Sequence, residues 1–153
     1  GDEICRRYRM INLHPAAPWG PTGTWQEVIW HLIGASARES GVMAHVATEV
    51  LDKGPVLAFC TFPIRGDQFD DLWREAEGRP LEALQARGEE QPLFRRIRQE
   101  GLLRERPLLV EAIRALAAGR VRIEGHRVVD ADGNPVEGFD LTDEVEGRLA
   151  SRG

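Results

Sequence analysis

Three short apolar segments in the first half of the chain have the length and the boundaries of buried strands. They cover residues 9–14, 41–47 and 56–64, and a proline or glycine stands beside each of them. Between the first two, a segment rich in proline and glycine leads to Thr24, which is suited to cap a helix. That helix is predicted from apolar residues at helical spacing, which are Trp25, Val28, Ile29, Leu32 and Ile33.

The middle of the chain predicts further helices. Asp67 is placed to cap a helix that runs through Trp73, and the following residues 81–92 are polar without a clear element. Residues 93–118 have a mostly helical pattern, in which Pro107 marks either a second helix start or a kink.

The end of the chain predicts a small hairpin and a tail. Residues 121–123 and 126–129 have strand character, 130–134 form a turn rich in Asp, Gly and Asn, and 141–153 are a charged tail. The order strand, helix, strand followed by a mixed remainder indicates the α/β class. A doubly wound sheet of only three long strands would have one flank and both faces incompletely covered by other elements. We therefore expect that a further segment precedes Gly1.

The composition of the chain argues against some classes of binding partner and favours one cellular compartment. The 153 residues carry a net charge of −5, which argues against nucleic acid and anionic membranes as partners. No apolar run reaches the roughly 18 residues of a membrane span, and no signal peptide opens the chain. Cys5 and Cys60 lie among apolar residues, which favours buried thiols in a reducing compartment and a cytoplasmic location. Five arginines are interpreted as one solvated helix face: Arg95, Arg96, Arg98, Arg104 and Arg106.

Three residues in two segments carry candidate chemistry. Asn12 and His14 alternate on the first predicted strand, so both side chains point to one side at the end of that strand. Asp52 stands beside the turn of Gly54 and Pro55. A core histidine, a loop-capping asparagine and a plain turn aspartate are the alternative interpretations. An amide, an imidazole and a carboxylate are nevertheless the groups that acyl transfer needs.

The order of these motifs resembles a known family. Asn12, Leu13, His14 and Pro15 come first, then a loop rich in proline and glycine, then Gly41 with His45, and then Asp52 with Gly54 and Pro55. The same order, continued by residues 63–71 and the terminal hairpin, is similar to the formyltransferase family, and within it to the phosphoribosylglycinamide formyltransferases. The resemblance covers nearly the whole chain, and the joint order is more specific than any single motif.

The resemblance implies a fold and an activity. The fold would be α/β, the C-terminal part of a formyltransferase-type Rossmann-like sheet flanked by helices, with a small terminal β-hairpin. Residues 1–153 would form the catalytic portion and would lack an N-terminal half. The enzyme would be a folate-dependent transferase of one-carbon groups, with 10-formyltetrahydrofolate as formyl donor and a small-molecule amine as acceptor.

The resemblance also implies roles for individual residues. Asn12 would donate a hydrogen bond to the formyl oxygen, His14 would act there as proton donor or electrostatic partner, and Asp52 would orient His14. His45 would line the same cleft. The folate pterin would be held by the segment Ala47, Thr48, Glu49, Val50 and Leu51.

Several departures from the family pattern leave the acceptor open. Ala16 follows the His-Pro pair in place of a serine, and tryptophans stand at residues 25 and 30 in place of a stretch that contains histidine. Leu102 stands where an acidic substrate contact is expected, although Glu100 and Glu105 are close in sequence, and residues 81–92 have the character of an insertion. Phosphoribosylglycinamide or a related amine, as in purine biosynthesis, remains the expected acceptor. A homodimer and an association with the N-terminal half both stay open.

Two other functions compete with transfer. With water as acceptor, the same residues would make a 10-formyltetrahydrofolate hydrolase. A folate-binding module without catalysis is a second alternative, although it would not need the proton chemistry of Asn12, His14 and Asp52. A generic nucleotide-binding domain finds no support, because the sequence has neither a G-x-G-x-x-G nor a Walker-type loop.

Overall fold

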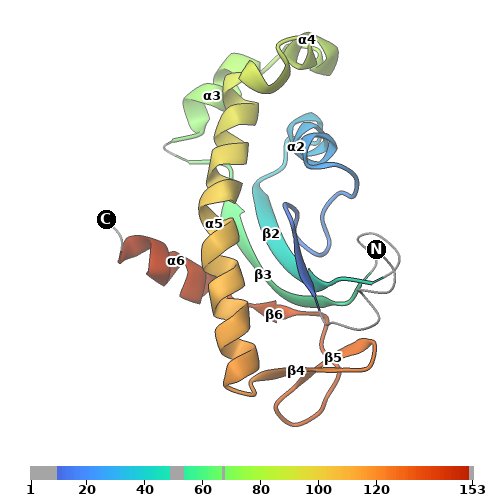
Figure 1. Cartoon of the computed structure of the whole chain (residues 1–153). Helices are drawn as coiled ribbons and strands as arrows, with labels where there is room; N and C mark the ends of the chain where they lie inside the picture. Colours follow the sequence, from blue (N-terminus) through green and yellow to red (C-terminus); the bar gives the residue numbers. More distant parts are fainter. Residues whose placement is uncertain (1–9, 49–53, 67, 152–153) are drawn as a thin grey trace.

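The computed structural model describes residues 10–48, 54–66 and 68–151. A four-stranded sheet lies against one long helix, and a separate two-stranded hairpin lies near the end of that helix (Figure 1). The sheet contains β1 (Ile11–His14), β2 (Glu39–Val46), β3 (Val56–Pro63) and β6 (Phe139–Asp140), in the order β1-β2-β3-β6. The first three strands are antiparallel, and β6 runs parallel to β3.

The separate hairpin consists of β4 (Val121–Glu124) and β5 (Arg127–Asp130).

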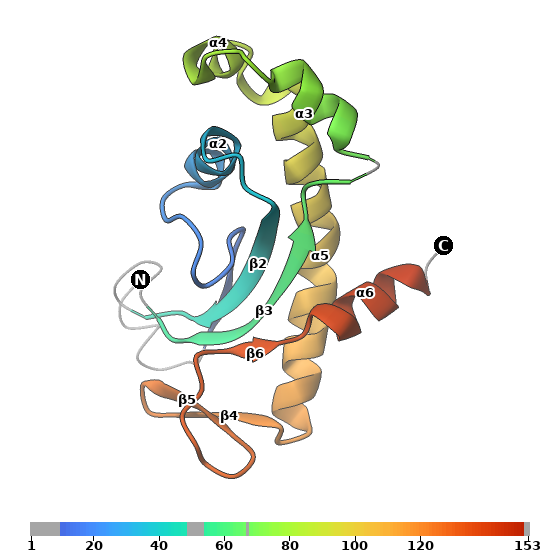
Figure 2. The same cartoon turned by 180° about the vertical axis from the view of Figure 1, so that it is seen from behind.

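The helices lie against one face of the four-stranded sheet and beyond one of its ends. Seen from behind, β6 leads directly into the last helix, which lies beside the long one (Figure 2). The helices are α2 (Trp25–Gly34), α3 (Asp70–Ala76), α4 (Leu81–Gln85), α5 (Pro92–Ala117) and α6 (Thr142–Ala150), with a short 3-10 turn at Gly88–Glu90.

The two faces of the sheet have different neighbours. Phe62 of β3 faces α5, because the Arg104 guanidinium lies 4.6 Å from the centre of its ring. Side chains alternate along a strand, so Cys60 and Ala58 share this α5 face and are fully buried there. Phe59 points to the opposite face, where its ring meets that of Trp19. The face that carries Phe59 is therefore turned away from α5.

The local predictions for the first half are confirmed. Thr24 is the N-cap of α2, and its hydroxyl accepts from the Glu27 N–H while the Glu27 carboxylate accepts from the Thr24 N–H. Val28, Ile29, Leu32 and Ile33 are the buried residues of α2. The two indoles of this helix, Trp25 and Trp30, are half-buried and pack on Phe94 of α5 at centroid distances of 5.8 and 4.6 Å.

The structure of the middle of the chain can be compared with the predictions for the helix after Asp67, for residues 81–92 and for Pro107. The first of the helices there, α3, begins at Asp70, whose carboxylate accepts from the Gly66 N–H, and the expected cap Asp67 lies outside the described residues. The polar segment 81–92 contains α4 and a 3-10 turn. Pro107 does not start a second helix, since α5 continues through it from Pro92 to Ala117.

The interpretation of the arginines as one solvated face is wrong for Arg104. Its side chain is buried, stacks on Phe62 and donates hydrogen bonds to Glu100 and Glu146. Burial alone would lower the pKa of the Arg104 guanidinium, but the bonds to Glu146 and Glu100 raise it overall. The sequence pattern missed this burial because the sheet and α6, both distant in sequence, cover that side of α5.

The prediction of a charged tail is wrong for Thr142–Ala150, which form α6. The Asp140 carboxylate accepts from the backbone N–H and the hydroxyl of Thr142 and so supports the start of the helix. Leu141 and Val145 are fully buried, and Arg148 pairs with Glu111 of α5. Glu146 likewise pairs with Arg104 of α5, so part of the charge of this segment is spent on ion pairs between the two helices.

Among the described residues, no helix combines the length and the apolar character that crossing a bilayer requires. Cys60 is fully buried, as predicted, and Cys5 lies outside the described residues.

Candidate active site

The antiparallel ladder of β1 and β2 brings the candidate residues together. Asn12 pairs with His45, and His14 pairs with Met43. Paired residues of an antiparallel ladder point to the same face, with Cβ atoms about 4.5–5.5 Å apart. Asn12, His14 and His45 therefore share one face of the sheet. Met43 pairs in turn with Phe59 on β3, so Phe59 lies on the same face as these residues. Because Phe59 points away from α5, the candidate residues lie on the sheet face turned away from α5.

The three side chains differ in their access to solvent. His14 is 8% exposed and His45 is 3% exposed, whereas Asn12 is exposed. The Nδ1 atom of His45 lies 3.4 Å from the carbonyl oxygen of Val46. Because a carbonyl oxygen only accepts, a hydrogen bond along this contact has its proton on Nδ1. Two shielded imidazoles thus lie beside an amide that can reach a ligand.

Backbone hydrogen bonds hold the described residues on either side of 49–53, in the connection from β2 to β3. The Val46 N–H donates to the Pro55 carbonyl at 2.9 Å, and the Ala47 N–H donates to the Met10 carbonyl at 2.8 Å. A Cβ at Gly54 would overlap the Val46 carbonyl oxygen, so only glycine fits this close approach. The described ends of the connection are therefore fixed next to the start of β1.

Not every predicted site residue can be compared with the structure. Asp52, Glu49, Val50 and Leu51 lie outside the described residues. Of the remaining predicted folate contacts, Ala47 and Thr48 are half-buried at the end of β2, and the Ala47 N–H is already engaged by Met10. A pterin could therefore use the Thr48 side chain or backbone carbonyls there, but not that N–H.

The two acids near Leu102 are held by arginines. Glu100 accepts hydrogen bonds from Arg104 and Arg96, and Glu105 lies 3.1 Å from Arg98. Burial would raise the pKa of Glu100, but these bonds lower it overall below the ordinary value. Leu102 itself is exposed. Neither acid is thus presented as an isolated carboxylate that could bind a substrate amine.

Sequence reasoning missed Met43, Phe59 and Trp19, which extend the site face beyond His14. Trp19 is an exposed indole in the loop between β1 and α2, 5.1 Å from the Phe59 ring. A tryptophan in a loop of proline and glycine was the only available signal, because the pairing with Phe59 joins residues 40 positions apart.

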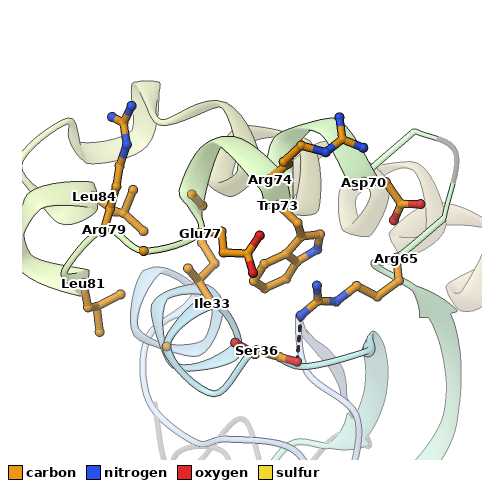
Figure 3. A pocket seen from close by; sticks show the side chains of 13 residues that line it. Ile33, Ser36, Arg65, Asp70, Trp73, Arg74, Glu77, Arg79, Leu81 and Leu84 are labelled. Atoms are coloured by element: carbon orange, nitrogen blue, oxygen red, sulfur yellow. Dashed lines mark hydrogen bonds between the residues drawn. The ribbon is translucent and has the colours of Figure 1, made fainter.

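A cavity of about 490 Å³ lies away from these residues, between α2, α3 and α4 (Figure 3). Arg65 stacks on Trp73 inside it and donates to the Ser36 carbonyl, while Glu77 points toward the indole. These residues lie on other elements than Asn12 and His14. In the part of the chain that the structure describes, no group of three or more His, Cys, Asp or Glu residues could hold a metal ion.

Solved structures with the same arrangement identify the fold. The phosphoribosylglycinamide formyltransferase from Coxiella burnetii matches with a TM-score of 0.53 and 23% identity, over 92% of this chain and 55% of its own. The enzyme of the same name from Anaplasma phagocytophilum matches with a TM-score of 0.52 and 14% identity, over 92% and 57%. The chain has the formyltransferase fold. This agrees with the fold class expected from the sequence.

A second group with the formyltransferase fold is equally similar. The formyltetrahydrofolate deformylase from Pseudomonas syringae pv. tomato matches with a TM-score of 0.52 and 18% identity, over 84% of this chain and 35% of its own. The chain therefore spans between about a third and somewhat more than half of the length of these structures. No family model and no curated protein matches the sequence.

Proposed function

We propose that this chain carries the catalytic residues of a folate-dependent formyltransferase, in which residues 1–153 form the catalytic portion. The observation that supports this most directly is the shared sheet face of Asn12, His14 and His45, which follows from the register of β1 and β2. The formyltransferase fold is consistent with it. The formyl group would be supplied by 10-formyltetrahydrofolate.

Asn12 is assigned to the oxygen of the formyl group. Its exposed side-chain amide donates a hydrogen bond to that oxygen, where negative charge grows as an amine attacks the carbonyl carbon. A donor aimed at such an oxygen accounts for about 10²–10³ in rate in other enzymes.

His14 and Asp52 are assigned to proton movement. The attacking amine must lose a proton, and an imidazole is a side chain that can accept a proton and pass it on. Asp52 is two residues before Gly54, whose backbone is fixed against Val46. In the proposal its carboxylate orients His14 and takes up the amine proton through water.

The donor would be held at the end of β2. His45 lines this side of the site opposite Asn12, and Thr48 offers polar groups at the same end. Ala47, Glu49, Val50 and Leu51 complete the proposed folate contacts. Because the Ala47 N–H is engaged by Met10, we assign Ala47 a contact through its carbonyl.

The acceptor in this proposal is a small-molecule amine, with phosphoribosylglycinamide or a related amine of purine biosynthesis as the first choice. The ion pairs of Glu100 and Glu105 leave Leu102 without an acidic neighbour that is free to bind the amine. If phosphoribosylglycinamide is the acceptor, its amine is bound by residues other than these two acids.

A hydrolase is the second candidate, because the similar solved structures include formyltetrahydrofolate deformylases from Pseudomonas syringae and Burkholderia mallei at TM-scores of 0.52 and 0.51. The two activities separate in one assay. A hydrolase releases formate from 10-formyltetrahydrofolate without an amine, whereas a transferase consumes the donor only when an acceptor is present.

The test is formyl transfer by the complete protein across a panel of amines, with His14→Ala and Asp52→Asn as variants. Both variants should lose at least about 10²-fold in kcat. Donor binding without turnover by the unaltered protein would favour a folate-binding module. Wild-type turnover by both variants would refute the assignment of the site.

A further inference from the structure

The cavity between α2, α3 and α4 lies on other elements than the proposed catalytic residues and has a volume of about 490 Å³ (Figure 3). Cavities of this size hold ligands of low molecular mass. One wall is α4, which belongs to the segment 81–92 that has the character of an insertion. This wall packs closely on α2, because a Cβ at Gly34 would lie 3.1 Å from the Leu81 side chain. The cavity is therefore built in part by a segment to which the proposed function gives no role.

Arg65 is held in a fixed position in this cavity. Its Nε donates to the Ala37 carbonyl at 3.2 Å, and its Nη2 donates to the Ser36 carbonyl at 2.9 Å. Its guanidinium carbon lies 3.6 Å from the centre of the Trp73 ring, and the indole N–H donates in turn to the Ile64 carbonyl. A guanidinium has five N–H groups, and the two bonds to carbonyls use two of them. Among the described residues no carboxylate pairs with Arg65, so the other three N–H groups are available to an anion.

Glu77 brings the opposite charge to the same indole. It is exposed directly after the end of α3, and its carboxylate points toward the Trp73 ring on which Arg65 stacks (Figure 3). Within the ranges that the structure describes, Glu77 forms no ion pair with Arg65 or with another cation. The two opposite charges thus stand beside one ring without neutralising each other. A molecule that carries both charges can bridge them.

The other lining residues supply apolar surface or are already engaged. Arg74 pairs with Asp71 at 2.6 Å. The Asp70 carboxylate accepts from the Gly66 N–H. Arg79 is exposed and extends past Leu84, with its guanidinium away from Arg65 and Glu77 (Figure 3). The apolar part of the wall consists of Ile33, Ala76, Leu81 and Leu84.

We propose that this cavity binds a free α-amino acid with an apolar side chain. The carboxylate of the amino acid accepts hydrogen bonds from Arg65, whose planar fork of N–H groups matches a carboxylate. Its ammonium group donates to Glu77, and its side chain lies against the apolar wall. A plain carboxylate leaves Glu77 without a partner, and a plain amine leaves Arg65 without one. The inference is independent of the proposed function, because it involves none of the residues assigned to formyl transfer.

The first experiment is isothermal titration calorimetry of the complete protein with leucine, valine, methionine and phenylalanine. If leucine binds as the side chains predict, three analogues separate the contributions: isocaproate lacks the ammonium group, isoamylamine lacks the carboxylate, and glycine lacks the apolar side chain. Each analogue should bind at least about tenfold more weakly, since a hydrogen bond to a charged group and the burial of a leucine side chain each contribute at least this much.

The second experiment locates the site with two variants on or beside α3. Glu77→Gln should weaken the binding of leucine at least about tenfold and should not weaken the binding of isocaproate, which has no ammonium group. Glu77 is exposed, so this variant is expected to fold. Glu75→Gln is the matched control, because Glu75 is exposed on α3 and does not line the cavity.

Three results would overturn the inference. The first is the absence of binding by all four apolar amino acids at about 10 mM. The second is isocaproate that binds as tightly as leucine, which would show a site for plain anions. The third is a loss of leucine binding that is equal in Glu77→Gln and Glu75→Gln, or absent from both.

Discussion

Asn12 and His45 lie directly opposite each other on the antiparallel strands β1 and β2. The pairing joins an exposed amide to an imidazole that is 3% exposed, on the sheet face away from α5. In the proposed function this pairing places the Asn12 amide, which donates to the formyl oxygen, directly opposite the imidazole that lines the donor side of the site.

Replacement of the Asn12 amide should slow the chemical step. Asn12→Ala should lower kcat about 10²–10³-fold with little change in KM, because the lost hydrogen bond is strongest when the formyl oxygen carries charge. Steady-state kinetics with the best acceptor measure this. Asn134→Ala is the matched control, since Asn134 belongs to the turn after β5 and contacts Asp130. A change confined to KM would argue against this role of Asn12.

The close approach of Gly54 to Val46 predicts a cost in both stability and activity. Gly54→Ala should destabilise the protein by about 1–3 kcal/mol, because a Cβ would overlap the Val46 carbonyl oxygen and force the backbone apart. The activity should also fall, since Asp52 is two residues away. Urea unfolding and kinetics measure the two effects.

Gly147→Ala provides the comparison for Gly54. Gly147 lies in α6 with open space around the position of a Cβ, so alanine there should be neutral or stabilise by up to about 1 kcal/mol. Equal stability of the two variants would show that the packing at Gly54 is not restrictive.

The ion pairs of Glu100 predict a loss of stability in acid. The folded-state pKa of Glu100 is lowered from 4.5, because hydrogen bonds from Arg104 and Arg96 outweigh the effect of burial. A lowered pKa adds stability that is present above the unfolded value and disappears as the pH falls through the folded value. The stability difference between the unaltered protein and Glu100→Gln should therefore be constant near neutral pH and shrink below pH 4.5.

Urea unfolding between pH 6 and pH 3 measures this difference. Glu75→Gln serves as control, because Glu75 is exposed on α3. A difference that grows as the pH falls would have the wrong sign for a carboxylate with a lowered pKa.

Cys60 should resist thiol reagents in the folded protein. Burial raises the pKa of its thiol to about 12, and the thiolate is the reactive form. In a Cys5→Ser variant, modification at pH 8 should follow the rate of unfolding and become fast in denaturant. Rapid labelling of the native variant would show that the α5 face of the sheet opens at Cys60.

Much of the local structure could be predicted from the sequence because it depends on neighbouring residues. The capping box of Thr24 and Glu27, the hairpin of β4 and β5 and the turn after Asp130 are closed by contacts within a few positions. Asn12 and His14 were recognised as candidates for the same reason, since their alternation on one strand is local.

Other features depend on residues that are far apart in sequence. The two-residue strand β6 has no periodicity of its own and is defined by its pairing with Ala58 and Phe59. Arg104 carries a surface-type side chain, but Phe62 and Glu146 bury it. The apolar side of α6 became visible only when the helix was packed against α5.

The sequence by itself determined the strands and the helix of the first half, the terminal hairpin and the polar groups that stand on β1, since backbone preferences and side-chain alternation act over a few residues. Only the tertiary structure decided that His45 faces Asn12 and that Trp19 stands on Phe59. These contacts depend on strand register and loop packing, which are selected by burial of the whole sheet and leave no periodic trace in the chain.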